Sequence, residues 1–174
     1  GIWLAPFIVH RKSKLAKEHP DWLLRNRFGI PVNAGFIWDS FTTGLDLTQP
    51  AAMDYACEVV RVAAHEWGFP YMKLDFLYAA ALPGFYHEPT RTRAQVLRHG
   101  LERLRAAAGE QTFILGCGCP LGSALGLVDA MRISSDVDVR WHPQYKGMRF
   151  YFKSEPDMPS ARNAIHNSLT RAPL

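Results

Sequence analysis

Cysteine is scarce in this sequence, and its pattern does not suggest disulfide bonds. The 174 residues include three cysteines, Cys57, Cys117 and Cys119, an odd number that cannot pair completely within one chain. No Asn-x-Ser/Thr glycosylation site occurs either. Because secreted proteins commonly carry such features, we expect a reducing, cytoplasmic environment.

Long apolar runs are also missing. No apolar segment approaches the roughly 18–20 residues that a membrane-spanning helix needs, so we expect no membrane partner. Residues Gly1 to Val9 are mostly apolar, but they have no basic leader or cleavage site, which argues against a signal peptide. The sequence starts without Met, and we expect it to begin inside a longer protein.

Positive charge is present but not concentrated. The formal net charge is +4, and the densest basic group lies on one predicted helix: Arg91, Arg93, Arg98, Arg103 and Arg105. A solvated helix face accounts for this group better than a groove that follows nucleic-acid phosphates. We therefore expect no nucleic-acid partner.

Short apolar segments alternate with longer segments of helical periodicity. Strands are predicted at Ile2–Val9, Tyr71–Leu77, Thr112–Leu115 and Ala130–Ser134. Helices are predicted at Ser13–Asn26 (interrupted near Pro20), Ala51–Trp67, Thr92–Ala108, Ser123–Leu127 and from Pro159 onward, and Gly29–Thr43 is predicted to be an ordered loop with a short strand at Gly35–Trp38. This alternation indicates parallel β/α units, and the apolar strands predict a sheet covered on both faces.

Two folds have this order of elements, an open doubly wound sheet and a barrel. No Gly-x-Gly-x-x-Gly follows the first strand, so the main dinucleotide-binding signal is absent. The chain is also shorter than the ~250 residues typical of a complete eight-unit barrel. We therefore predict an α/β fold in which residues 1–174 form part of a single (β/α)8-barrel domain.

Polar side chains occur at the ends of two predicted strands, where barrels carry their active sites. Lys73 and Asp75 alternate along one strand, as do Arg132 and Asp136 if the other strand extends that far. Asp75 and Asp136 lie 61 residues apart, which is close to two repeats of ~31 residues. A carboxylate pair at a barrel mouth suits glycoside hydrolysis. From spacing alone, each carboxylate could instead belong to a structural ion pair.

The sequence resembles glycoside hydrolase family 36, the bacterial α-galactosidases. Matching segments follow one another along almost the whole chain: Gly-Ile-Trp-Leu-Ala-Pro-Phe at 1–7, His-Pro-Asp-Trp at 19–22, Leu-Asp-Leu-Thr at 45–48, Lys-Leu-Asp-Phe-Leu at 73–77, Phe-Ile-Leu-Gly-Cys-Gly-Cys-Pro-Leu at 113–121, Met-Arg-Ile-Ser-Ser-Asp at 131–136 and Pro-Ser-Ala-Arg at 159–162. Each segment alone is weak, but their ordered combination is specific.

The resemblance implies a role for each candidate residue. Asp75 would be the nucleophile of a retaining mechanism and Asp136 its general acid/base, on strands four and six of a barrel whose strands three to six lie in this chain. The candidate substrate-binding residues are Lys73 and Arg132 for sugar hydroxyls, Trp3 for an apolar sugar face, Cys117 beside the nucleophile, and Trp141 on the leaving-group side. No metal and no organic cofactor is implied.

Several residues have a second interpretation. Trp3 could be a core aromatic side chain, and Trp38 is expected to pack although its loop could reach substrate. Cys117 and Cys119 lack convincing partners for a zinc site. Asp138 is a second carboxylate near Asp136 and competes with it for the acid/base role.

The expected substrate is an α-galactoside oligosaccharide. The acidic residues that bind galactose in this family would lie before Gly1, so galactose specificity is implied by the resemblance alone. Transglycosylation of the raffinose or stachyose synthase type and a non-catalytic sugar-binding barrel are alternatives. The full-length protein could form a homo-oligomer.

Overall fold

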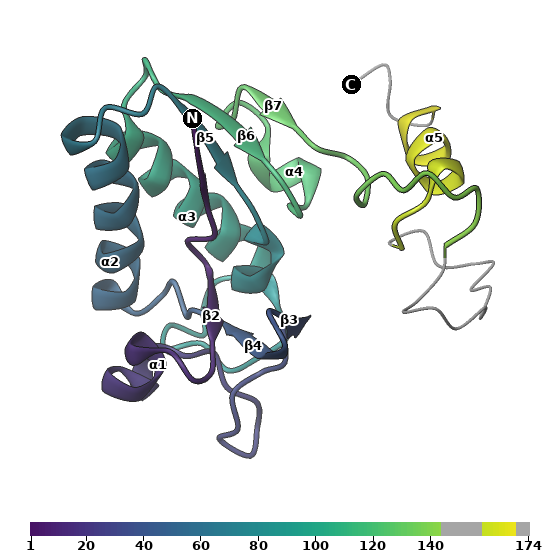
Figure 1. Ribbon diagram of the computed structural model, residues 1–174. Coiled ribbons are helices and arrows are strands. Elements are labelled where there is room, and N and C mark those ends of the chain that lie inside the picture. Colours follow the sequence, from purple (N-terminus) through teal and green to yellow (C-terminus); the bar gives the residue numbers. More distant parts are fainter. Residues whose placement is uncertain (144–157, 170–174) are drawn as a thin grey trace. The chain divides into compact units, whose positions relative to one another are not determined.

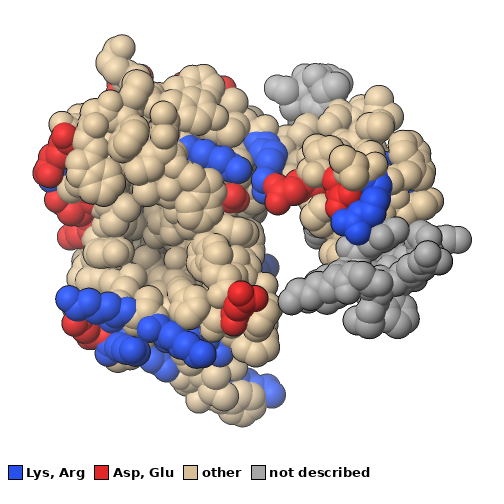
Figure 2. Space-filling model, viewed as in Figure 1, with Lys and Arg blue, Asp and Glu red and all other residues tan. Residues whose placement is uncertain are grey.

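The computed structural model describes residues 1–143 and 158–169 and separates into two compact units (Figure 1). The first unit comprises Gly1–Met131 and the second Arg132–Leu174. Charged side chains on the first unit lie toward the rim of the face seen in Figure 2, around a broad uncharged middle. In the described ranges, every helix is too short or too polar to span a membrane.

A four-stranded parallel sheet forms the centre of the first unit. It contains β1 (Ile2–Leu4), β5 (Tyr71–Leu74), β6 (Phe113–Gly116) and β7 (Ala130–Met131), in the spatial order β1-β5-β6-β7. All three pairings are parallel, as the alternation of strands and helices predicts. Each new strand is therefore added on the same side of the previous one.

Helices cover one face of this sheet. The helices α2 (Pro50–Arg61) and α3 (Arg93–Ala108) pack side by side (Figure 1), and α2 continues into the π-helical turn η2 (Val62–Glu66). Met72, Leu74 and Ile114 point into the hydrophobic core beside residues of these helices. Burial of this apolar face supplies the main driving force for the fold.

The other face of the sheet is partly exposed, and we call it the open face. Its side chains alternate with the buried ones and come from Trp3, Tyr71, Lys73, Phe113 and Leu115. The rings of Tyr71 and Phe113 stack there, with centroids 5.3 Å apart. Apolar side chains occupy both faces, and helices of the described residues cover one of them. The covering of the second face stays a prediction.

A second, antiparallel sheet lies between β1 and β5 in the sequence. It contains β2 (Ile8–His10), β3 (Gly35–Ile37) and β4 (Ser40–Gly44), in the order β2-β4-β3. The single strand predicted at 2–9 is wrong, because the chain turns at Pro6 and its two halves join different sheets. Much of the predicted loop at 29–43 is also strand, and only the short strand near Gly35 was expected.

The remaining boundaries differ from the predictions by a few residues. The helices α1 (Lys14–Glu18), η1 (Pro20–Trp22), η3 (Leu77–Ala81), α4 (Leu121–Ala124) and α5 (Ala161–Leu169) complete the described elements. The strand β5 ends at Leu74 rather than at Leu77. The 3-10 helix η3 begins at Leu77, where a loop was predicted to start. Similarly, β7 ends at Met131 and does not reach Ser134.

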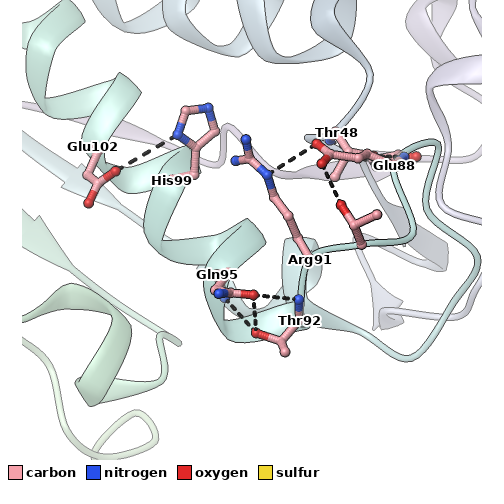
Figure 3. A network of polar contacts seen from close by, with 9 residues as sticks. Thr48, Glu88, Arg91, Thr92, Gln95, His99 and Glu102 are labelled. Carbon is pink, nitrogen blue, oxygen red and sulfur yellow. Dashed lines mark hydrogen bonds and ion pairs between the residues drawn. The ribbon is translucent and has the colours of Figure 1, made fainter.

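The start of α3 agrees closely with its prediction. The Thr92 hydroxyl accepts the N–H of Gln95, and the Gln95 side chain accepts the N–H of Thr92, which forms a capping box (Figure 3). The same surface carries the ion pair Glu88–Arg91 and a contact between His99 and Glu102 (Figure 3). Gly109 then ends the helix with φ of 79° and ψ of 158°, a conformation that glycine adopts far more readily than other residues.

Candidate active site

Asp75 lies at the carboxyl end of β5 and is 5% exposed. Its backbone N–H donates to the Leu4 carbonyl over 2.9 Å, so the pairing with β1 continues one residue beyond the strand. Phe76 then takes a left-handed conformation with φ of 53°, and the chain turns into η3. The backbone of Asp75 is therefore fixed to the sheet, and the chain leaves the sheet directly after this residue.

Two N–H donors and a cation lie close to the Asp75 carboxylate. Its Oδ1 accepts the N–H of Phe76 over 2.8 Å, and its Oδ2 accepts Nε1–H of Trp3 over 3.1 Å. The ammonium group of Lys73 lies 3.8 Å from Oδ2. Two N–H donors and a nearby cation stabilise negative charge on a carboxylate. The predicted site residues Trp3, Lys73 and Asp75 are thus brought together.

Trp3 lies outside the hydrophobic core formed by the described residues, with 44% of its surface exposed. Its ring makes edge-to-face contacts with Trp38, at a centroid distance of 6.2 Å, and with Phe76, at 6.3 Å. Such aromatic pairs prefer this geometry over a face-to-face stack. These contacts fix the direction of the indole N–H that binds Asp75.

Cys117 follows β6 and is completely buried at the same edge of the sheet. Its N–H donates to the Leu74 carbonyl over 2.8 Å, so it adjoins the strand that carries Asp75. Burial, and then Cys117, raise the pKa of the Cys119 thiol to about 12, which keeps that thiol protonated at neutral pH. The described residues contain no group of His, Cys, Asp or Glu suited to a metal ion.

Phe76 and Tyr78 are neighbours of Asp75 that the sequence reasoning missed. The Tyr78 hydroxyl donates to the Ala34 carbonyl over 2.6 Å and so ties η3 to the antiparallel sheet. Burial, and then the charge of Asp75, raise the pKa of Tyr78, so this hydroxyl remains a donor at neutral pH. Both residues fall in the matching segment or just after it, but no residue pattern indicates their contacts.

The second unit carries Arg132, Asp136 and Trp141. Arg132 Nη1 donates to Asp136 Oδ1 over 2.5 Å, and the Asp136 side chain is 74% exposed. Trp141 is also exposed. The strand does not extend to Asp136, as a shared side for Arg132 and Asp136 would require, because β7 ends before both residues. A turn of irregular chain brings them together instead.

Asp138, the other candidate for the acid/base role, forms an ion pair with a different arginine. Arg140 donates to Asp138 Oδ1 from Nε over 2.9 Å and to Oδ2 from Nη2 over 2.5 Å. These hydrogen bonds lower the pKa of Asp138 to about 2. Both carboxylate oxygens of Asp138 therefore accept hydrogen bonds from Arg140.

The chain is similar to solved structures of α-galactosidases, although no protein-family model matches it. TtGalA, the α-galactosidase from Thermus thermophilus, solved in complex with stachyose, shares 40% sequence identity with it over 98% of this chain, with a TM-score of 0.83. This chain is related to the α-galactosidases. It spans 35% of the length of that structure, so the match concerns about a third of such an enzyme.

Two solved structures with lower sequence identity share only the fold with this chain. Isomalto-dextranase from Arthrobacter globiformis is 24% identical, with a TM-score of 0.54 over 92% of this chain and 29% of its own. The GH36 α-galactosidase AgaA from Geobacillus stearothermophilus is 22% identical, with a TM-score of 0.51 over 74% of this chain and 19% of its own. The fold therefore recurs among glycosidases that differ widely in sequence.

Proposed function

We propose that the protein carrying this chain is a retaining α-galactosidase, with Asp75 as nucleophile and Asp136 as general acid/base. The observation that carries the proposal is the buried Asp75 carboxylate at a strand end, held by two N–H groups and approached by Lys73. A carboxylate fixed in this way is oriented and charged for attack on an anomeric carbon. The 40% identity to TtGalA over 98% of the chain supports the α-galactosidase activity in this proposal.

The fold proposed for the whole protein is a (β/α)8 barrel, with β1, β5, β6 and β7 as its strands three to six. Two features support this. The strands follow one another in sequence order without the reversal of a doubly wound sheet, and helices α2 and α3 cover the same core-facing side. The open face would then line the barrel interior, with Asp75 at its mouth.

The proposed reaction is a double displacement. Asp75 attacks the anomeric carbon as the bond to the leaving oxygen breaks, and Asp136 gives that oxygen its proton. Asp136 then takes a proton from water, which displaces Asp75 from the covalent glycosyl-enzyme. Because Arg132 pairs with Asp136, the proposal requires that this pair loosen before Asp136 can act as an acid.

The proposed substrates are α-galactosides, since TtGalA was solved with stachyose and with p-nitrophenyl α-D-galactopyranoside. Lys73, Trp3, Arg132 and Trp141 are proposed to contact substrate. Cys117 is completely buried, so its proposed role is to support Asp75 from within the protein. Product analysis at high sugar concentration distinguishes hydrolysis from transglycosylation.

The nucleophile assignment is tested with two substitutions in the full-length protein. Asp75→Ala should lower kcat for p-nitrophenyl α-D-galactopyranoside by roughly 10⁴-fold or more. Asp54→Ala, which removes an exposed carboxylate of α2, is the matched control and should have little effect. With Asp75→Gly, azide can attack from the vacated side, so its product should be the inverted β-galactosyl azide. An α-galactosyl azide, or full activity without Asp75, contradicts the assignment.

A further inference from the structure

Trp38 stands at the tip of a hairpin in an unusual backbone conformation. It and Asp39 form the two-residue connection between β3 and β4, with φ of 55° and 57°. Two positive φ values define a type I′ turn, which strongly favours Asn and Gly. A bulky residue in this region is rare and costs free energy. The turn alone therefore does not account for a tryptophan at this position.

The Trp38 ring is not used to fill the hydrophobic core, since 47% of its surface is exposed. It makes edge-to-face contacts with two other rings, Trp3 at a centroid distance of 6.2 Å and Phe76 at 5.7 Å. Trp3 and Phe76 also contact each other at 6.3 Å. We call these three rings, Trp3, Trp38 and Phe76, the aromatic triad.

Both other members of the aromatic triad bind Asp75. The Trp3 indole N–H reaches Oδ2, and the Phe76 backbone N–H reaches Oδ1. Phe76 itself has a positive φ of 53°, so its conformation also depends on support from its surroundings. Trp38 therefore touches the two residues that orient the carboxylate and reaches them from a different sheet.

We propose that Trp38 is a positioning residue for Asp75, because its ring fixes Trp3 and Phe76 and, through them, the two N–H groups on the carboxylate. The proposal rests on the assignment of Asp75 as nucleophile. It predicts that Trp38 acts on the rate of the chemical step and not on sugar affinity. Small displacements of a reacting group slow catalysis strongly without weakening binding.

The test compares two substitutions at Trp38 in the full-length protein. Trp38→Asn suits the left-handed turn but removes the ring. We expect kcat for p-nitrophenyl α-D-galactopyranoside to fall roughly tenfold to a hundredfold, with unchanged galactose affinity and an unchanged or higher melting temperature. Trp38→Phe keeps an aromatic ring and should restore most of kcat.

Trp67→Asn is the matched control, since Trp67 is 62% exposed and its ring pairs with Phe69 rather than with the aromatic triad. It should leave kcat unchanged. Trp3→Phe keeps a ring but loses the indole N–H, so its effect combined with Trp38→Asn should be less than multiplicative.

Three results would overturn the inference. An unchanged kcat in Trp38→Asn would show that the ring has no role, and a loss of galactose affinity at constant kcat would make Trp38 a substrate contact. A multiplicative Trp3/Trp38 double variant would make the two residues independent. Inactivity of the unsubstituted protein would instead refute the proposed function.

Discussion

Asp136 and Asp138 are two residues apart, and their different ion pairs lead to different expectations. Arg140 binds both carboxylate oxygens of Asp138 and lowers its pKa to about 2. Asp136 has a single-atom contact with Arg132 and an exposed side chain. We propose Asp136 for the acid/base role because Arg132 contacts one of its oxygens and because the Arg-Ile-x-x-Asp register of the resemblance favours this residue.

We expect Asp136→Ala to slow the hydrolysis of raffinose-type sugars by roughly 10²- to 10⁴-fold, the usual contribution of a general acid. The effect on p-nitrophenyl α-D-galactopyranoside should be smaller in the first step, because p-nitrophenolate leaves without a proton. Steady-state rates on both substrates measure this difference. Asp138→Ala serves as the control, and a larger loss from it than from Asp136→Ala would reverse the assignment.

At the residue scale, sequence reasoning identified Asp75 and its neighbour Lys73 but not their full environment. A carboxylate at the end of an apolar strand is visible in the sequence. The contacts of Phe76 and Tyr78 depend on η3 folding back against the antiparallel sheet, and no local pattern predicts that. Trp38 was recognised as a loop residue within reach of substrate, but its link to Trp3 required the hairpin.

At the scale of single elements, α3 depends on its capping box. Thr92→Ala removes the hydroxyl that accepts the Gln95 N–H and should lower the free energy of unfolding by about 1 kcal/mol. Urea denaturation measures this. Thr90→Ala, which removes only an exposed hydroxyl bound to Glu88, is the control and should cost less. Equal losses would mean that the capping box contributes nothing.

The accuracy of element prediction followed the strength of local signals. The boundaries of α3 were predictable because Thr92 and Gly109 mark its ends by their own chemistry. The strand β4 was missed because Ser40, Thr42 and Gly44 resemble loop residues, and its pairing with β2 is made over a long sequence separation. Pro6 indicates a turn, but it lies within an apolar run that was interpreted as one strand.

At the scale of the whole molecule, substitutions on the open face test whether the proposed barrel is correct. Tyr71 is 39% exposed in this chain, yet a closed barrel would bury it. We expect Tyr71→Lys to abolish soluble expression of the full-length protein or lower its melting temperature sharply, since an unpaired buried charge is costly.

Phe36 provides the comparison, because it is 56% exposed on a strand of the antiparallel sheet. Phe36→Lys should be tolerated, as judged by melting temperature and soluble yield. Similar tolerance of Tyr71→Lys would argue that the open face stays in contact with water. The apolar strands predict that this face is covered, but the residues that would cover it could not be predicted from this sequence, because the chain spans 35% of its relative TtGalA.

The short hairpin at Trp38 also limits how this chain can change in length. Side chains alternate along a strand, so one inserted residue between Gly35 and Thr42 would keep the strands paired but send the following side chains to opposite faces. Trp38 would then point away from Trp3, even if every other residue of the hairpin stayed the same. Evolution could lengthen the exposed turn at Gly29 freely, whereas the number of residues in the hairpin should stay constant even as most of them are replaced.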